Sequence, residues 1–187
     1  MYKLIVLFGP AGAGKDYILK KALEEIPLLH KPTLYTSRPM RQGEVDGVAY
    51  NFVDNDTFTE MLLDGTLIEA SVFNHWGYGS AEDSYDKQKI NILALGIDHL
   101  KDFIEYHSDI FEICPVFVAA SQKTRLMRQL TREEDPNVQE IVRRFQSDEI
   151  DYSKDKIDSL AKAVLWNEEL EDCVRALKSL RSLVESM

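Results

Sequence analysis

One short segment constrains this sequence more than any other. Near the N-terminus it reads Gly9-Pro10-Ala11-Gly12-Ala13-Gly14-Lys15, which matches G-x-x-x-x-G-K, the pattern of a phosphate-binding loop. The apolar run Lys3 to Phe8 precedes it, and Asp16 to Ile26 follows with apolar residues at helical spacing. Because the segment lies between a predicted strand and a predicted helix, its N–H groups and the Lys15 ammonium can surround the phosphates of a nucleoside triphosphate.

The residue that follows the lysine departs from the usual pattern. Asp16 stands where such a loop normally has serine or threonine, whose hydroxyl contacts Mg²⁺. A carboxylate is also a good Mg²⁺ ligand, but it brings negative charge close to the phosphates. Two roles are open: Asp16 binds Mg²⁺, directly or through water, or it turns away as an acidic residue of the first helical turn.

Length, charge and hydropathy limit the class of protein. The chain has 187 residues, of which 44% are hydrophobic, and this suits a single enzyme-sized domain. The N-terminal apolar run is too short for a signal peptide or a membrane span, so we expect a cytoplasmic protein with no membrane partner. A formal net charge of -10 argues against nucleic-acid binding, which depends on a basic surface. Both a monomer and a homodimer fit the sequence.

Three further apolar runs predict buried strands, at Ile90 to Leu95, Ile113 to Ala119 and Ala163 to Trp166. A helical pattern follows each run, with Ser121 as the expected N-cap of the second of these helices. Strands that are apolar on both faces and alternate with helices indicate a parallel sheet covered by helices on both sides. The sequence therefore predicts an α/β fold.

The segment 33–80 has a different character, with more polar and aromatic residues. Short strands are expected at Tyr50 to Val53 and at Thr66 to Phe73. Between them a short helix is expected, capped by Asp54, ended by Gly65 and with Phe58, Met61 and Leu62 on one face. We interpret this segment as a small α+β lobe inserted into the parallel domain.

A last helix start is predicted at Asp135-Pro136, a capping residue followed by proline at the first helical position. Val138 to about Ile150 should then be helical. The preceding segment, Arg128 to Asp135, becomes a helix end and an exposed connection.

The segment Thr36 to Phe52 reads T-S-R-P-M-R-Q-G-E-V-D-G-V-A-Y-N-F. It resembles the guanylate kinase family, whose corresponding segment reads close to T-T-R-x-P-R-x-G-E-x-x-G-x-x-Y-x-F. The likeness continues through Phe58, Glu69 and Tyr78-Gly79-Ser80. The resemblance implies one P-loop NTPase domain over 1–187, with a core of about 1–32 and 81–187, a monophosphate-binding lobe of about 33–80 and a lid of about 125–145.

The resemblance also assigns the binding of GMP, to Arg38, Arg41, Tyr50, Glu69, Tyr78, Ser80 and Asp98. The chemistry of these side chains agrees. Arg38 and Arg41 can hold a monophosphate by bidentate hydrogen bonds, and the hydroxyls of Tyr50 and Tyr78 can add neutral donors. The Glu69 carboxylate can accept the two N–H donors of a guanine edge, and this is how the family is understood to select guanine.

Two positions depart from the family pattern. Leu34 stands where the family has a serine that helps to hold the guanine oxygen, and the loss of one donor in a buried polar site costs roughly 1–3 kcal/mol. Gly96 replaces the first aspartate of the family's L-D-x-D, while Asp98 matches the second. We therefore expect GMP or dGMP as acceptor, with less strict exclusion of other bases.

Seven of the nine arginines fall in two blocks, and the second block resembles the family's lid. Arg128 and Arg132 resemble its R-L-x-x-R pair, and Arg144 resembles the arginine of its R-R-L run. Lid arginines neutralise the charge on the transferred phosphoryl group. Asn167, which follows the last predicted strand, matches an asparagine near the adenine of ATP. The resemblance thus assigns catalysis to Lys15, Arg128, Arg132 and Arg144, and ATP binding to residues 9–16 and Asn167.

These features predict an ATP-dependent kinase that converts GMP or dGMP to GDP or dGDP by direct in-line transfer, with Mg²⁺ on the donor phosphates. Two alternatives are open. One is a kinase of the same fold that accepts another deoxynucleoside monophosphate, which Leu34, Asp16 and Gly96 favour. The other is a binding module that keeps the fold and has lost catalysis, although the retained Gly14-Lys15 and arginines argue against it.

Overall fold

The structure is a computed structural model that describes residues 1–48, 50–73, 75–132 and 134–187. Its contacts divide the chain into two compact units. The first, called here the loop unit, consists of Met1–Leu29 and Lys89–Met187; the second, called the lobe unit, is His30–Gln88. No helix of the described residues is long and apolar enough to cross a bilayer.

A five-stranded sheet forms the centre of the loop unit, in the order β2-β7-β1-β8-β9. Its strands are β1 (Tyr2–Phe8), β2 (Leu29–His30), β7 (Ile90–Leu95), β8 (Phe111–Ala119) and β9 (Ala163–Trp166). β1 pairs in parallel with β7 and β8, and β8 pairs in parallel with β9. The four longer strands confirm the apolar runs of the sequence, whereas two-residue β2 was not predicted, because so short a strand has no periodicity of its own.

Six helices of the described residues accompany this sheet: α1 (Lys15–Glu25), α3 (Ile97–His107), α4 (Gln122–Leu130), α5 (Val138–Asp151), α6 (Lys154–Leu160) and α7 (Leu170–Ser186). Ser121 caps α4 as expected, because its side chain accepts the Thr124 N–H. The predicted cap at Asp135 is wrong: the Asn137 side chain caps α5 by accepting the Glu140 N–H. The helix thus begins beyond Pro136. α6 was not predicted.

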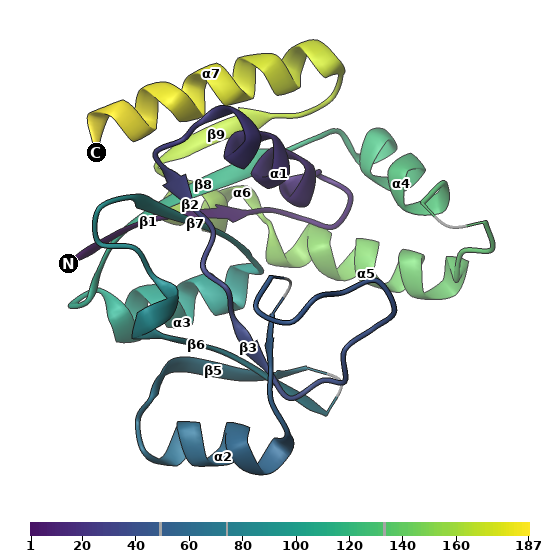
Figure 1. Ribbon diagram of the computed structural model, residues 1–187. Helices are drawn as coiled ribbons and strands as arrows, with labels where there is room; N and C mark the ends of the chain where they lie inside the picture. The colour runs from purple at the N-terminus through teal and green to yellow at the C-terminus, as the bar shows by residue number, and fades with distance from the viewer. Residues whose placement is uncertain (49, 74, 133) are drawn as a thin grey trace. The chain divides into compact units, whose positions relative to one another are not determined.

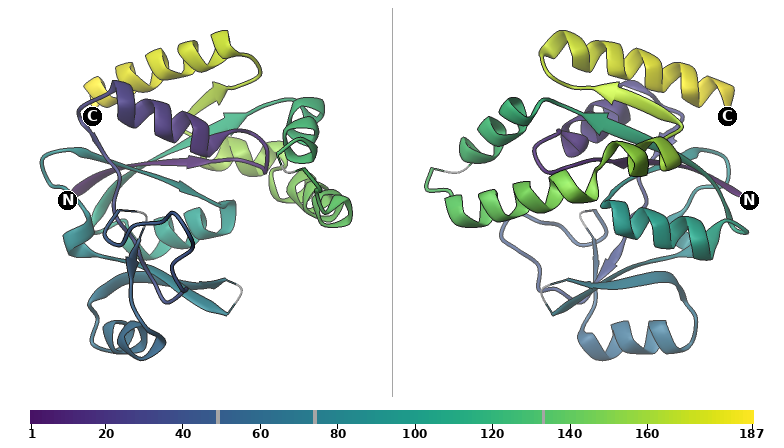
Figure 2. Two further views of the ribbon diagram at one scale, coloured as in Figure 1. Left: turned by 45° about the vertical axis from the view of Figure 1, so that its right-hand side comes forward. Right: turned by 180° about the vertical axis from the view of Figure 1, so that it is seen from behind.

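Both faces of the central sheet are covered. α1 and α7 pack on one face, where Ile18 and Leu180 join apolar side chains of β1, β7 and β8 in one buried cluster. On the other face Phe103 of α3 contacts Phe111, with ring centroids 5.2 Å apart. Figure 1 and Figure 2 show α1 and α7 on one side of the sheet and α3 on the other. This arrangement confirms the predicted helix-covered parallel sheet and leaves the carboxyl ends of its strands to carry a site.

The lobe unit contains a four-stranded sheet in the order β4-β3-β6-β5. Its elements are β3 (Tyr35–Thr36), β4 (Asn51–Phe52), α2 (Asn55–Leu63), β5 (Leu67–Phe73), β6 (Trp76–Ala81) and the 3-10 helix η1 (Glu82–Ser84). β6 pairs antiparallel with both β3 and β5, while β3 and β4 are parallel. The expectation of a small α+β arrangement in this segment agrees with these elements.

α2 packs on the lobe sheet through a single buried anchor. Asp54 caps it by accepting the Thr57 N–H, and Phe58 is buried beside Leu67 and Ala81. Of the three residues expected on one face, Phe58 and Met61 pack in this cluster, whereas the Leu62 side chain is 51% exposed. Strand β6 was not predicted, since glycine disfavours strands. Gly77 is needed there all the same: a Cβ would lie 2.4 Å from the Phe58 ring.

Candidate active site

The phosphate-binding loop connects β1 to α1, as the sequence predicted. Gly14 is the N-cap of α1 and has a φ of 92°, in the left-handed region that favours glycine. A Cβ on Gly14 would lie 2.1 Å from Nδ2 of Asn167, so a larger residue would displace the asparagine. The loop therefore requires glycine at this position for both its backbone conformation and its packing.

Asn167 and Arg128 hold the loop by its carbonyl groups. Asn167, buried directly after β9, donates from Nδ2 to the Ala13 carbonyl oxygen at 2.8 Å. The Arg128 guanidinium donates to the carbonyl oxygens of Gly12 at 3.3 Å and Ala13 at 3.4 Å, and also to that of Glu168 at 3.0 Å. These bonds satisfy buried loop carbonyls and fix the loop against the segment that follows β9.

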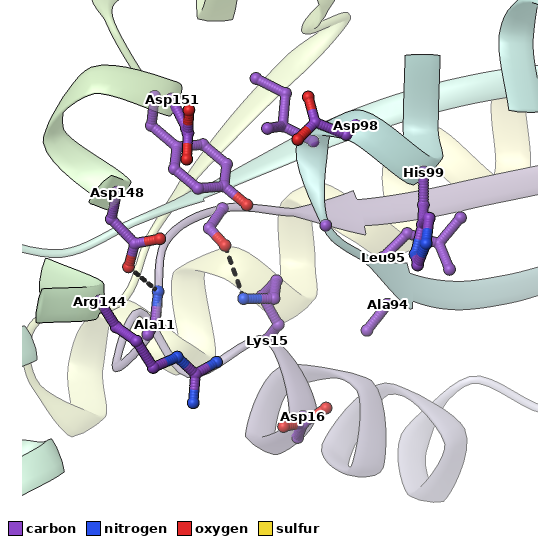
Figure 3. Close-up of a pocket in the computed structure, with 14 residues that line it drawn as sticks. Ala11, Lys15, Asp16, Ala94, Leu95, Asp98, His99, Arg144, Asp148 and Asp151 are labelled. Atoms are coloured by element: carbon purple, nitrogen blue, oxygen red, sulfur yellow. Dashed lines mark hydrogen bonds between the residues drawn. The ribbon is translucent and has the colours of Figure 1, made fainter. Parts of the chain in front are cut away.

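A pocket of about 420 Å³, called here the loop pocket, adjoins the phosphate loop within the loop unit. Its walls come from the loop, the end of β7, the start of α3 and one face of α5, as Figure 3 shows. It holds two basic side chains and four carboxyl groups, namely Lys15, Arg144, Asp16, Asp98, Asp148 and Asp151. Such a pocket can hold a polyphosphate against the two cations.

Lys15 is enclosed at the base of this pocket. Its Nζ donates to the carbonyl oxygens of Gly9 at 2.6 Å and Pro10 at 3.3 Å. Burial lowers the pKa of the Lys15 ammonium, and the carboxylates of Asp16 and Asp148 oppose this shift. A phosphate anion would favour the charged form of Lys15 in the same way, so the site is electrostatically suited to a highly charged ligand.

Asp16 lies in the first turn of α1, where its side chain is exposed and borders the loop pocket. Carboxylate oxygens are ligands that Mg²⁺ prefers. However, the described residues contain no group of three or more acidic, histidine or cysteine side chains that could hold a metal ion. The residues thus fit an ion that takes most of its ligands from phosphate and water, with Asp16 as one protein ligand.

A second pocket of about 420 Å³, called the Asn167 pocket, lies on another side of the loop within the loop unit. It is lined by Gly14, Tyr17, Arg128, Asn167, Glu168, Glu169 and Cys173. The lining offers the Tyr17 ring as a flat apolar surface and Arg128 and Asn167 as polar groups, a combination that suits a planar base. Tyr17 was not identified from the sequence as a site residue, although its position two residues after Lys15 could have suggested it.

The structure separates the predicted lid arginines. Arg144 borders the loop pocket, whereas Arg128 borders the Asn167 pocket. Arg132 lies beyond the end of α4 with an exposed side chain. In the same block Arg125 is buried, pairs with Glu149 of α5 and lies with its guanidinium carbon 4.8 Å from the centroid of the Phe145 ring. Arg125 thus joins α4 to α5.

The lobe unit assembles its own cluster around Arg38. The guanidinium is buried and forms two hydrogen bonds with the Glu44 carboxylate, at 3.0 and 2.8 Å. Its central carbon lies 5.6 Å from the centroid of the Tyr50 ring and 5.5 Å from that of the Phe52 ring. The rings of Tyr50 and Tyr78 meet edge to face at 5.8 Å. The predicted phosphate-binding side chains Arg38, Tyr50 and Tyr78 are therefore together.

Arg41 joins this cluster through its backbone, because its N–H donates to Glu44 at 2.7 Å while the side chain is exposed. Glu44 was not assigned a role from the sequence, but it orients both Arg38 and the Arg41 backbone. Hydrogen bonding by Arg38 lowers the pKa of the Glu44 carboxyl. An acidic residue six positions after an arginine gives too weak a signal to find such a pair.

Glu69 and Ser80 lie opposite each other on β5 and β6. Burial raises the pKa of the Glu69 carboxyl to about 7, and a hydrogen bond from the Ser80 hydroxyl opposes the shift. The Tyr85 hydroxyl donates to Ser80 Oγ at 2.9 Å. Glu69 is thus a partly buried carboxylate beside a pair of hydroxyl groups.

The remaining predicted residues lie in different units. Leu34 is partly buried in the lobe unit, and its carbonyl oxygen accepts the Asn51 N–H at 2.8 Å. Asp98 belongs to the loop unit, where it is exposed in the first turn of α3 and pairs with Lys101 at 3.7 Å. Its proposed contact with GMP stays a prediction.

A family model described as guanylate kinase matches residues 1–184. A guanylate kinase of Legionella pneumophila (strain Lens) is 39% identical over 100 residues, which cover 53% of this chain and 46% of that protein. A guanylate kinase of Chlorobium luteolum is 28% identical over 184 residues, covering 94% and 88% of the two chains. The alignment with the Legionella protein therefore spans about half the length of that relative.

A solved structure supports the fold independently. The crystal structure of guanylate kinase from Anaplasma phagocytophilum is 19% identical to this chain, has a TM-score of 0.65 and covers 99% of this chain and 85% of its own. This likeness confirms the predicted α/β fold with its parallel core sheet. Because the family model extends over nearly the whole sequence, the chain belongs to the guanylate kinase family.

Proposed function

We propose that this protein is a nucleoside monophosphate kinase that transfers the γ-phosphoryl group of ATP to GMP or dGMP, forming GDP or dGDP. The observation that supports the proposal is that the chain has two groups of side chains suited to phosphate, one in each unit. One is the loop with Lys15 and Arg144, and the other is Arg38 with Tyr50 and Tyr78. A kinase of this kind needs one such group for the donor and one for the acceptor.

On the donor side, the loop N–H groups and Lys15 would hold the β- and γ-phosphates. Arg144, which borders the same pocket, would neutralise charge that spreads over the transferred group. The Asn167 pocket would take the base of ATP, with Tyr17 and Arg128 beside the ring. No covalent intermediate is needed, because positioning and charge stabilisation carry phosphoryl transfer.

On the acceptor side, Arg38 would bind the monophosphate while Glu44 holds the guanidinium in place. Arg41, whose side chain is exposed, would add a second cation. Glu69 would accept the N1–H and exocyclic amine of guanine, with Ser80 fixing the carboxylate. Glu69 must be ionised to accept both donors, so its raised pKa makes acceptor binding sensitive to pH near neutrality.

Mg²⁺ would bridge the donor phosphates and reduce their negative charge, with Asp16 as a protein ligand. The assignment of Asp16 rests on its exposure in the first turn of α1 beside the loop pocket.

One observation favours a broader choice of base. Leu34 supplies no hydroxyl where the family has a serine, which removes one donor to the guanine oxygen. A kinase for another deoxynucleoside monophosphate is therefore the second candidate.

A coupled assay of ADP formation tests the proposal, with saturating MgATP and a panel of GMP, dGMP, AMP, dAMP, UMP, CMP and dTMP. We expect the highest kcat/KM with GMP or dGMP. Highest activity with another monophosphate would select the second candidate. Nucleotide binding without ADP formation from any acceptor would contradict both.

A further inference from the structure

The carboxylate of Asp148 binds the phosphate loop itself. The Ala11 backbone N–H donates to Asp148 Oδ2 at 2.7 Å, across 137 residues of sequence. Asp148 is a partly buried residue of α5 in the loop pocket, and Figure 3 draws this bond as a dashed line. A carboxylate oxygen thus occupies one N–H of a loop whose N–H groups serve to bind phosphate oxygens.

The lysine of the loop is also paired internally in this structure. Lys15 Nζ donates to the carbonyl oxygen of Gly9 at 2.6 Å, and Figure 3 shows this second bond at the base of the same pocket. The Asp148 carboxylate is close enough to oppose the fall in the pKa of Lys15. Asp148 therefore acts on both kinds of phosphate-binding group in the loop, one N–H and the ammonium.

A bound phosphate and Asp148 compete for the same donor. Both are anions, and a single N–H directs one good hydrogen bond, so a phosphate oxygen at Ala11 must displace the carboxylate. The two like charges would also repel each other in the partly buried pocket. Arg144 lies four residues before Asp148 on α5, and both side chains border the loop pocket. One helix face therefore carries a cation that attracts the triphosphate and an anion that opposes it.

We propose that Asp148 is an internal competitor of the donor nucleotide: it occupies the Ala11 N–H, lowers the affinity of the loop for the triphosphate, and leaves that N–H when ATP binds. The inference rests on the proposed function, because it requires ATP to bind the phosphate loop. It makes the affinity for the donor depend on α5, a segment remote in sequence from the loop.

The opposite role for Asp148 would be that of a metal ligand that strengthens the binding of MgATP. The two roles give different results when Mg²⁺ is removed. A competitor weakens the binding of ATP whether or not Mg²⁺ is present. A metal ligand contributes only when Mg²⁺ is present.

The test is calorimetric titration of the full-length protein with ATP, without an acceptor, once in EDTA and once in excess Mg²⁺. The variants are Asp148→Asn, which keeps the shape of the side chain, and Asp148→Ala, which removes the acceptor oxygen. The control is Asp151→Asn, because Asp151 borders the same pocket but accepts a hydrogen bond from Ser147 at 3.0 Å. The control removes the same charge without touching the loop. Circular dichroism verifies that each variant is folded.

We expect both Asp148 variants to bind metal-free ATP about three- to tenfold more tightly than the wild type, since one charge-assisted hydrogen bond no longer has to be broken. Asp151→Asn should change the affinity less than about twofold, because Asp151 accepts its hydrogen bond from Ser147 and no hydrogen bond to the loop is lost. The inference is overturned if, in EDTA, the Asp148 variants bind ATP no more tightly than the wild type. It is also overturned if the variants bind ATP more weakly than the wild type only when Mg²⁺ is present. Failure of the wild type to bind ATP at all would instead overturn the proposed function.

Discussion

Asn167 Nδ2 donates a hydrogen bond of 2.8 Å to the carbonyl oxygen of Ala13, although 154 residues separate the two in sequence. Both residues are buried. This bond ties the segment after β9 to the middle of the phosphate loop, so we expect it to support both the fold and the donor site.

Replacement of Asn167 by alanine would leave the Ala13 carbonyl group without this partner. We expect the free energy of unfolding to fall by about 1–3 kcal/mol and the KM for ATP to rise, with the acceptor KM unchanged. Chemical denaturation and steady-state kinetics measure the two effects. The matched control is Asn91→Ala: Asn91 is also buried, but donates to the Lys3 carbonyl oxygen within the sheet, so this variant should lose stability while keeping the KM for ATP.

Removal of the loop ammonium should stop catalysis without unfolding the protein. We expect Lys15→Ala to lower kcat by about a hundredfold or more, because a positive group aimed at the transferred phosphate is lost. Burial lowers the pKa of Lys15, so relief of the buried charge offsets the loss of its hydrogen bonds to Gly9 and Pro10, and the melting temperature should change little. Lys20→Ala, at an exposed position of α1, is the control. Turnover at the wild-type rate in Lys15→Ala would refute the donor-site assignment.

Acceptor binding should strengthen as the pH rises through 7. The Glu69 carboxyl has a pKa of about 7, and its ionised form accepts the guanine donors, so a proton must leave before GMP binds at lower pH. Between pH 6 and pH 8 we expect the acceptor KM to fall by up to about tenfold, one pH unit on each side of this pKa. Glu69→Gln should bind GMP more weakly and lose this dependence. If the acceptor KM of Glu69→Gln depends on pH as strongly as that of the wild type, the titrating group is the phosphate of the substrate and not Glu69.

The Glu69 carboxyl should also make the stability of the protein depend on pH, but in the opposite direction: stability should fall as the pH rises. Because the pKa of Glu69 is raised in the folded state, the folded protein holds a proton that the unfolded chain releases above pH 4.5. The free energy of unfolding contributed by Glu69 should therefore be largest below pH 4.5 and decline as the pH rises to about 7. The difference between wild type and Glu69→Gln, measured by urea denaturation across this range, isolates the contribution from those of the other carboxyl groups.

Restoring a hydroxyl at position 34 should narrow the choice of base. We expect Leu34→Ser to raise the ratio of kcat/KM for GMP over that for AMP by about tenfold, within the range of one recovered hydrogen bond. Leu34→Ala removes the same apolar atoms without adding a donor and should leave the ratio near that of the wild type. If both variants shift the ratio equally, the change is due to the smaller side chain at position 34 and not to a new hydrogen bond.

Arg41 should act on the acceptor only. Its side chain is exposed while its backbone is held by Glu44, so truncation removes a cation without disturbing the loop around it. We expect Arg41→Ala to raise the KM for GMP by about tenfold or more and to leave the KM for ATP unchanged. Arg175→Ala, at an exposed position of α7, controls for the loss of one positive charge. If Arg41→Ala changes only the KM for ATP, the assignment of acceptor binding to the lobe unit is wrong.

Elements with a strong local pattern could be predicted. The runs that became β7 and β9 are rich in apolar residues, and their observed limits match the sequence pattern. β7 is buried over its first four residues, whereas in β9 Val164 and Trp166 are exposed and only Leu165 is buried. Strand β6 could not be found in this way, because Gly77 weakens the strand signal and is explained only by the Phe58 ring that packs against it. The start of α5 was misread because Asp135 and Asn137 both suit a cap, and only the Asn137 side chain accepts the helix N–H.

The phosphate loop follows from the sequence by itself, because its conformation is local: glycines in a seven-residue segment allow a backbone that other residues resist. Only the tertiary structure decided which distant side chains meet this loop. Asp148 and Asn167 reach Ala11 and Ala13 from α5 and from the end of β9. Those contacts depend on how helices and strands pack, and no spacing along the chain records them.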